Sequence, residues 1–321
     1  MIHSFSFGGR RVLAGVLGAL SLGASACALV PPEQASPSLP PGLVLASQER
    51  LYEQAVLSRF ERGGDTPLVA HVVRLDLDPE TLRLDTTSAD ESGGGEFVAR
   101  LTSAELARTG AQLAVNASYF LPFRGGRKGG EDYYPHVGDA VWASGAVIAD
   151  GRPASPAETA LDVRVNAILC MRDARLQILP GQVCPKWATD AVAAGPLLLE
   201  NGRRADVSAH DPDYAASLAP RTALGLSRDR RTAWIVVVDG RQPGYSLGVG
   251  LAELADLFFA LGAVDALNLD GGGSSTLVRQ GEDGRPEIVG RPIHTNVPGR
   301  ERPVANHLVV FIGTPKQGPR P

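Results

Sequence analysis

The sequence lacks the residue patterns that identify many common catalytic and metal-binding chemistries. It has only three cysteines, and no Cys-x-x-Cys pair, nucleophile elbow or Ser-His-Asp arrangement is evident. His136, His210 and His294 fall in predicted loops and do not have the spacing of metal ligands. No basic cluster is interleaved with aromatic residues, so nucleic acid is not an expected partner. Any chemistry must therefore come from other residue types.

The N-terminus has no acidic residue before Glu33, which is typical of a targeting segment. Arg10 and Arg11 precede an apolar stretch at 12–22, and Ala24-Ser25-Ala26 forms an A-x-A cleavage site. The apolar stretch is too short to span a bilayer as a stable helix. We therefore predict a signal peptide over residues 1–26 and export of the protein.

Cys27 directly follows the predicted cleavage site. Small residues before a cysteine resemble a bacterial lipobox, although Ala24 stands where leucine is usual. Acylation of Cys27 would make the protein a periplasmic or cell-envelope lipoprotein, whereas ordinary cleavage would leave a free thiol. Residues 27–45 are rich in proline and predict an extended linker, which would hold the domain away from a membrane surface.

The remaining chain is predicted to form one domain over residues 67–313. Residues 42–62 have a weakly helical composition, and the Pro- and Gly-rich tail 314–321 is predicted to be disordered. In an oxidising compartment Cys170 and Cys184 would close a short loop as a disulfide. Two unpaired thiols are the alternative.

Residues 233–270 predict a β-α-β unit. Apolar runs at 234–238 and 264–269 are typical of buried strands, and apolar residues recur at helical spacing between positions 251 and 261. Gly262 provides the helix stop. We therefore expect an α/β (mixed α+β) fold whose mixed sheet contains two parallel strands and a right-handed crossover.

Each predicted strand of this unit is followed by a carboxylate. Asp239 follows the first strand and Asp270 follows the second. The carboxyl ends of parallel strands meet at one rim of the sheet, where ligands bind in open α/β folds. If the strands are neighbours, about 4.8 Å apart, the two carboxylates would reach the range of paired acid/base residues. The alternative is that one of them only caps a turn.

The run Gly271-Gly272-Gly273-Ser274-Ser275-Thr276 follows Asp270 directly. Three glycines cost conformational entropy on folding, which a chain accepts where the backbone turns sharply or lies close to another group. Their N–H groups could bind an anion as a nest does. No lysine follows, so the run is not a Walker A loop.

Three further residues each have two interpretations. Arg221 precedes a predicted strand and has a donor fork that fits a phosphate, but a surface salt bridge is as consistent with the pattern. Asn116 and Tyr119 lie at the end of a predicted buried strand. They are either site residues or ordinary turn and core residues.

Five segments of the chain are distinctive in their order. They are Asn116–Phe120, Ala194–Leu198 with Asn201-Gly202, Arg221–Gly225, Asp239-Gly240 with Asn268–Thr276, and Arg302–Asn306. Together these segments resemble the phosphodiester glycosidase family, which includes N-acetylglucosamine-1-phosphodiester α-N-acetylglucosaminidases. The resemblance spans residues 67–313. It departs from the family at Ala117-Ser118, where two glycines are usual, and at His307, where a small residue is common.

The resemblance implies a hydrolase that cleaves the glycosidic bond of sugar-1-phosphodiesters on an envelope or extracellular glycan. Arg221 and the backbone of Gly271–Gly273 would bind phosphate, and Asp239 and Asp270 would activate water or stabilise positive charge at the anomeric carbon. No cofactor is expected, although calcium or another divalent cation stays open. The residues expected to contact the sugar or its phosphate also include Asn116, Tyr119, Thr222, Asn268, Ser274 and Ser275.

Two other functions stay open at this point. The same scaffold could serve a non-catalytic protein of glycan binding or polysaccharide assembly, because a fold does not determine a function. Asp239, Asp270 and Asn268 could instead hold a hard cation in a metal-dependent phosphodiesterase that cuts the P–O bond.

Overall fold

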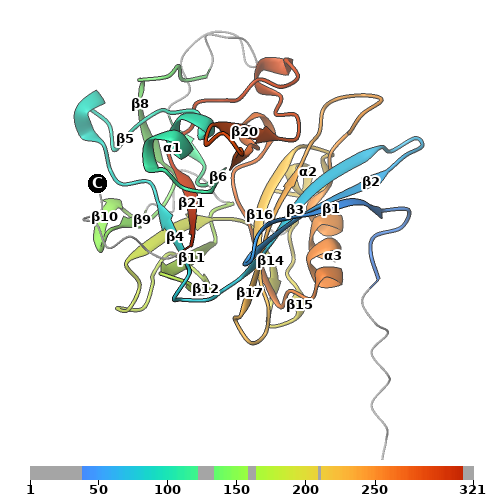
Figure 1. Cartoon of the computed structure of the whole chain (residues 1–321), viewed down its shortest axis with the longest axis horizontal. Coiled ribbons are helices and arrows are strands. Elements are labelled where there is room, and N and C mark those ends of the chain that lie inside the picture. The colour runs from blue at the N-terminus through green and yellow to red at the C-terminus, as the bar shows by residue number, and fades with distance from the viewer. Residues whose placement is uncertain (1–37, 122–133, 158–163, 209–210, 314–321) are drawn as a thin grey trace, which may run out of the picture. The chain divides into compact units, whose positions relative to one another are not determined.

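A computed structural model describes residues 38–121, 134–157, 164–208 and 211–313 (Figure 1). The predicted signal peptide, Cys27, most of the predicted linker and the tail 314–321 lie outside the described residues. No helix among the described residues is long and apolar enough to cross a membrane.

The largest sheet of the described chain has eight strands in the order β1-β2-β3-β17-β16-β18-β14-β15. Short turns join several neighbours. Residues 227–231 connect β16 to β17, and Asn201-Gly202, both with positive φ, connects β14 to β15 as the Asn-Gly pair predicts. The strands are β1 Val44–Tyr52, β2 Ala55–Arg62, β3 Leu68–Asp76, β14 Leu197–Glu200, β15 Arg203–Arg204, β16 Arg221–Leu226, β17 Thr232–Val238 and β18 Asp265–Asn268.

The predicted α/β class and mixed sheet are wrong. Strands predominate over helices, at 44% against 13%, and the described chain has three α-helices. Every pairing between its named strands is antiparallel. The elements β17, α3 (Leu251–Leu261) and β18 occur in the predicted order, but β16 lies between the two strands. The hairpin to β16 and the pairing with β3 occupy both edges of β17, so β18 pairs with the free edge of β16 instead.

The sheet also begins earlier in the chain than predicted. Residues 42–62, expected to be weakly helical and outside the domain, contain β1 and β2, which form a hairpin beside β3 (Figure 1). Most of β1 is exposed, and it carries the charged side chains of Glu49 and Arg50. Charges on an edge strand discourage pairing with other chains.

Three smaller sheets complete the described chain, in the orders β20-β19-β6-β21-β4, β10-β9-β13-β11-β12 and β5-β8-β7. Helix α1 (Thr102–Thr109) covers the first of these and ends at Gly110. The strands are β4 Leu82–Thr86, β5 Phe97–Val98, β6 Leu113–Asn116, β7 Phe120–Leu121, β8 Ala140–Ala143, β9 Val147–Ala149, β10 Arg152–Ser155, β11 Ala167–Arg172, β12 Arg175–Pro180, β13 Asp190–Ala194, β19 Leu277–Gln280, β20 Pro286–Val289 and β21 His307–Ile312.

The central strands β17, β16 and β18 of the large sheet are buried on both faces. One face packs against helix α3, whose Leu254 and Phe258 are fully covered by the sheet. The other face packs against strands of the two five-stranded sheets, through residues such as Leu224 and Leu267. Burial on both faces explains why residues 223–226 of β16, 233–238 of β17 and 266–267 of β18 form continuous runs without charged side chains instead of alternating.

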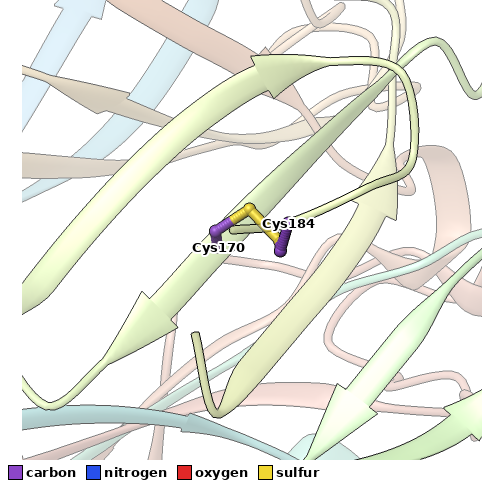
Figure 2. Close-up of a disulfide and its surroundings, with 2 residues drawn as sticks. All are labelled: Cys170 and Cys184. Carbon is purple, nitrogen blue, oxygen red and sulfur yellow. A yellow bond between two sulfur atoms is a disulfide. The ribbon is translucent and has the colours of Figure 1, made fainter. Parts of the chain in front are cut away.

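Cys170 and Cys184 are joined by a disulfide, as the sequence analysis favoured (Figure 2). Cys170 is buried in β11, and Cys184 lies in the segment that follows β12. The bond spans 14 residues and ties this segment to the sheet. A loop of this length is constrained in the unfolded chain, which is the main source of disulfide stabilisation in the chain-entropy account.

A substitution at Gly225 in β16 tests how tightly α3 packs on the sheet. A Cβ atom at this position would lie 2.5 Å from a ring carbon of Phe258 and 3.1 Å from the Ala263 methyl group. We expect Gly225→Ala to lower the free energy of unfolding by about 1–3 kcal/mol through overpacking. Gly63→Ala is the control, because no atom lies within 4 Å of that added Cβ. Equal denaturant midpoints for the two variants would contradict this packing.

Candidate active site

The carboxyl ends of β17 and β18 reach the same edge of the large sheet. Both strands run antiparallel to β16, so they run in the same direction as each other. Val238 pairs with Arg221 at the start of β16, and the Leu269 N–H donates to the Thr222 carbonyl at 2.8 Å. Asp239 and Asp270 therefore follow strand ends that lie on either side of β16, roughly two strand spacings or 10 Å apart.

The backbone after Asp270 forms a short 3₁₀ turn, and its amide groups are largely used within the protein. The Gly271 N–H donates to the Asp270 carboxylate at 2.9 Å, and the Gly272 N–H donates to the Pro220 carbonyl at 2.8 Å. The Ser274 N–H donates back to the Gly271 carbonyl at 3.2 Å. The turn is thus held against the start of β16 instead of presenting a full nest of free amides.

Each glycine of the turn permits a close approach. A Cβ at Gly271 would lie 2.9 Å from the Pro220 carbonyl oxygen. At Gly272, where φ is +62°, a Cβ would lie 3.1 Å from both terminal nitrogens of Arg241. At Gly273 a Cβ would lie 2.8 Å from the guanidinium carbon of Arg302 and closer still to one of its nitrogens. The glycine run therefore brings backbone against two guanidinium groups.

Arg302 is buried and held on several sides. Its Nε donates to Nδ1 of His294 at 3.2 Å, and its Nη1 donates to the Ser274 hydroxyl at 3.2 Å. The Tyr134 ring lies 3.8 Å from the guanidinium carbon, in cation–π geometry. Burial lowers the pKa of Arg302, and the nearby Asp270 carboxylate opposes that change. The group remains a cation at neutral pH because an arginine pKa starts so high.

Asp270 is the carboxylate of this cluster. Burial raises its pKa above the ordinary value of 3.8, while a hydrogen bond from Ser274 and the charges of Arg302 and Arg164 act in the opposite direction. A partly desolvated carboxylate near the guanidinium groups of Arg302 and Arg164 is the kind of perturbed group found at catalytic sites.

Asn116 holds this loop in place from the end of β6. Its side-chain amide donates to the Asp270 carbonyl at 2.6 Å, and its carbonyl accepts from the Thr222 hydroxyl at 2.9 Å and from the Thr276 N–H at 3.1 Å. It is fully buried. Asn116 and Thr222, both predicted to contact substrate, are therefore placed as a link between β6, β16 and the loop.

Asn268 and Tyr119 form a second buried network beside the loop. The Asn268 amide donates to the Tyr119 hydroxyl at 2.9 Å and to the Gly195 carbonyl at 2.8 Å, and the hydroxyls of Tyr119 and Tyr214 lie 2.8 Å apart. Arg164 lies against both tyrosine rings. Burial is the main reason that the pKa of Tyr119 is raised, so this phenol stays protonated.

Arg221 is fully buried and is held by backbone carbonyl groups. Its Nε donates to Val249 at 3.2 Å, and its Nη2 donates to the carbonyls of Tyr214 at 2.7 Å and Ser217 at 2.9 Å. The last two carbonyls belong to the C-terminal end of α2 (Pro212–Ala216), where a cation is favourable. This placement connects Arg221 to α2 more directly than to the glycine loop.

Asp239 lies in a separate network on the other side of β16. Its carboxylate accepts from the Tyr245 hydroxyl at 2.8 Å and from the Arg291 N–H at 2.9 Å, and it lies 3.1 Å from Nε2 of His71. Three such contacts satisfy most of its acceptor capacity. The structure therefore places Asp239 and Asp270 at one edge of the sheet but in different hydrogen-bond networks.

Sequence analysis missed four residues that surround the glycine loop: Arg241, Arg302, His294 and Tyr134. His294 was noted only as a histidine in a predicted loop without metal-ligand spacing, and it is buried. Arg302 was noted only as part of a family segment. The signal that could have identified a guanidinium partner was the length of the glycine run, because such a run indicates that something lies against it.

Several polar atoms near the loop are buried without a protein partner. They are the Nη1 of Arg221, the Oδ1 of Asn268, the Oγ of Ser275 and the Oγ1 of Thr276. Such atoms are uncommon in folded proteins and suit a polar ligand or ordered water. Among the described residues, no group of three or more His, Cys, Asp or Glu side chains is placed to hold a metal ion.

Comparisons with solved structures show a shared fold. The catalytic domain of zebrafish N-acetylglucosamine-1-phosphodiester alpha-N-acetylglucosaminidase, auto-inhibited by its pro-peptide, has a TM-score of 0.58 at 16% identity and covers 84% of this chain and 87% of its own. A Synechocystis protein has a TM-score of 0.54 at 14% identity, over 83% of this chain and 63% of its own. A Burkholderia pseudomallei K96243 protein has a TM-score of 0.51 at 17% identity, over 76% of this chain and 74% of its own.

Comparison at the sequence level identifies the family directly. No curated protein matches the chain. The model of the family described as phosphodiester glycosidase, however, matches residues 109–311, which include the glycine loop, Asp239, Asp270 and Arg302. This match covers more than half of the 321 residues and confirms the resemblance seen in the sequence. The chain therefore belongs to the phosphodiester glycosidase family.

Proposed function

We propose that this protein hydrolyses the bond between the anomeric carbon of a sugar and an oxygen of a phosphodiester, on an extracellular or envelope glycan. One observation carries the proposal beyond family membership. The charge of Arg302, whose guanidinium approaches the backbone of Gly273, acts on the Asp270 carboxylate, and Arg302 in turn lies near Arg241, whose guanidinium approaches Gly272. Such a cluster can bind a singly charged diester and also act on the carbon attached to it.

The two guanidinium groups suit the phosphodiester anion. Arg302 is buried and fixed, so its planar donor group is oriented before a ligand arrives. Arg241 is exposed, with a positive φ of 58°, and adds positive charge at the mouth of the same site. We assign phosphate binding to these residues in preference to Arg221 because their guanidinium groups lie against the glycine loop, whereas the Arg221 guanidinium is held by the carbonyl groups of Tyr214 and Ser217.

Asp270 is the group best suited to act at the anomeric carbon. As a carboxylate it stabilises the oxocarbenium-like charge that develops there, or it removes a proton from the attacking water. A phosphate leaving group is weakly basic, so protonating it contributes less than it does for an ordinary glycoside. One carboxylate in contact with the reacting centre is therefore sufficient. We assign that contact to Asp270, whereas Asp239 lies in its own hydrogen-bond network with His71 and Tyr245.

The sugar would lie toward the tyrosine network. Tyr119, Tyr214 and Asn268 supply hydroxyl and amide groups beside Asp270, and the Oδ1 of Asn268 is a buried acceptor that a sugar hydroxyl can satisfy. In the reaction the C1–O bond breaks with its electron pair left on the phosphate oxygen. Water forms the new C1–O bond and loses a proton, so the products are a free sugar and a phosphomonoester.

The proposed reaction is tested by incubating the purified protein with a panel of sugar-1-phosphodiesters in oxygen-18 water. C–O cleavage places the label on the sugar, and mass spectrometry should find it there. Label on the phosphate would indicate a P–O phosphodiesterase and overturn the proposal. Binding of the diesters without any product would favour a non-catalytic glycan-binding protein.

Asp270→Asn should reduce kcat on a hydrolysed diester by about 10²–10⁴, because the neutral amide neither stabilises developing positive charge nor accepts a proton. Asp65→Asn is a matched control at an exposed carboxylate outside the site. Steady-state kinetics on both variants, with circular dichroism to show that they fold, provide the measurement. Near-normal turnover by Asp270→Asn would remove this residue from the mechanism.

The pH profile of kcat/KM should fall on the acid side, and the apparent pKa of this acid limb should lie above the ordinary aspartate pKa. Burial raises the pKa of Asp270, so the active carboxylate is lost on acidification at a higher pH than for an exposed aspartate. Arg302 acts to lower this pKa, and Arg302→Gln should therefore move the limb to still higher pH. The exposed Arg285→Gln variant should leave the limb unchanged. A limb that shifts downward in Arg302→Gln would contradict the assignment.

We further propose that the protein acts outside the cytoplasm, as a lipoprotein tethered through Cys27. The N-terminal sequence pattern supports this, and so does the Cys170–Cys184 disulfide, because such bonds form and persist in oxidising compartments.

A further inference from the structure

His294 has a definite protonation state in this structure because of its partner. Nε of Arg302 is always protonated and can only donate, so Nδ1 of His294, 3.2 Å away, must accept. The neutral ring then carries its proton on Nε2. An imidazolium would point an N–H at the guanidinium and lose this hydrogen bond. The pair therefore works only with a neutral histidine whose Nδ1 faces Arg302.

The backbone around His294 is held in an unfavourable conformation. Thr295, the next residue, has φ of 51° and ψ of 32°, and Asn296 has φ of 61°. A positive φ is a genuine outlier for a β-branched residue such as threonine. Local hydrogen bonds fix it: the Thr295 hydroxyl donates to the His294 carbonyl at 2.8 Å, and Arg300 Nη1 donates to that hydroxyl at 2.9 Å. Strain of this kind concentrates at functional sites.

This strained segment completes the surroundings of the Arg302 guanidinium. The Tyr134 ring lies on one side of it, the Gly273 backbone lies close to it, and the Ser274 hydroxyl binds Nη1. His294 binds Nε, and this hydrogen bond restricts the rotation of the planar donor group about its own axis. The orientation of the fork determines whether it can donate to two oxygens of one phosphate group.

We propose that His294 is a positioning residue, whose Nδ1 acceptor orients Arg302 toward the phosphate of the substrate. This inference rests on the proposed function, because it takes Arg302 to be the phosphate-binding group. His294 lies outside the glycine loop. The strained backbone of Thr295 then serves to hold the His294 imidazole in place.

The test compares His294→Asn with His294→Leu. Asparagine and leucine have nearly the same shape, and the Oδ1 of asparagine can occupy the place of Nδ1, so the two variants differ mainly in the acceptor. We expect His294→Asn to stay within about threefold of the wild type in the dissociation constant for inorganic phosphate, measured by calorimetry. His294→Leu should weaken binding about 10- to 100-fold, as expected for a lost hydrogen bond to a charged group. Thermal unfolding shows whether both variants fold.

A second measurement does not need a ligand. The Arg302 Nε–H signal in a nitrogen-15 NMR spectrum, assigned by its absence in Arg302→Lys, should persist in His294→Asn and exchange rapidly with water in His294→Leu. In the double variant His294→Leu/Arg302→Lys, the histidine change should cause little further loss of phosphate affinity.

The outcomes separate this inference from the proposed function. Equal phosphate binding and equal NMR protection in both histidine variants would overturn the positioning role, as would equal loss in both. A wild-type protein that binds phosphate but hydrolyses no sugar phosphodiester would overturn the proposed function alone. If the wild type also fails to bind phosphate, the inference that His294 prepares a phosphate-binding fork is wrong, whatever the NMR signals show.

Discussion

The candidate site depends on the close approach of two guanidinium groups to a glycine backbone. A Cβ at Gly273 would overlap the buried Arg302 guanidinium, so that approach requires glycine, and at Gly272, which faces Arg241, the positive φ of 62° also favours glycine. The conformational entropy lost by the glycines is the cost of this arrangement. In return, positive charge is concentrated beside the Asp270 carboxylate without an intervening layer of side chains.

The antiparallel sheet provides the framework for this approach. Because β17 and β18 both pair with β16, the segments that follow them emerge on either side of Pro220 and Arg221. The first segment supplies Arg241, and the second supplies the glycine loop. Apolar packing on both faces of the sheet fixes the three strands, and the loops at their ends gain a defined separation from that packing.

Buried polar networks then fix the loops themselves. Asn116 binds the backbone before and after the glycines, Asn268 binds the tyrosine hydroxyls, and His294 binds Arg302. A buried amide or imidazole that loses its partner is costly, so each network has essentially one arrangement. Groups that act on a charged substrate need this kind of preorganisation, since it avoids reorientation during the reaction.

Local features of this protein were determined by the sequence itself. Apolar spacing predicted α3, and the Asn201-Gly202 pair predicted a hairpin. The residues of the glycine loop indicated a close-approach site next to a carboxylate. These features depend on neighbouring residues, whose conformational preferences are readable from their order. Only the tertiary structure decided that β16 lies between β17 and β18, because strand pairing depends on which edges are already occupied. It also decided that the guanidinium groups of Arg302 and Arg241 lie against Gly273 and Gly272, because contacts between distant residues are set by packing of the whole sheet.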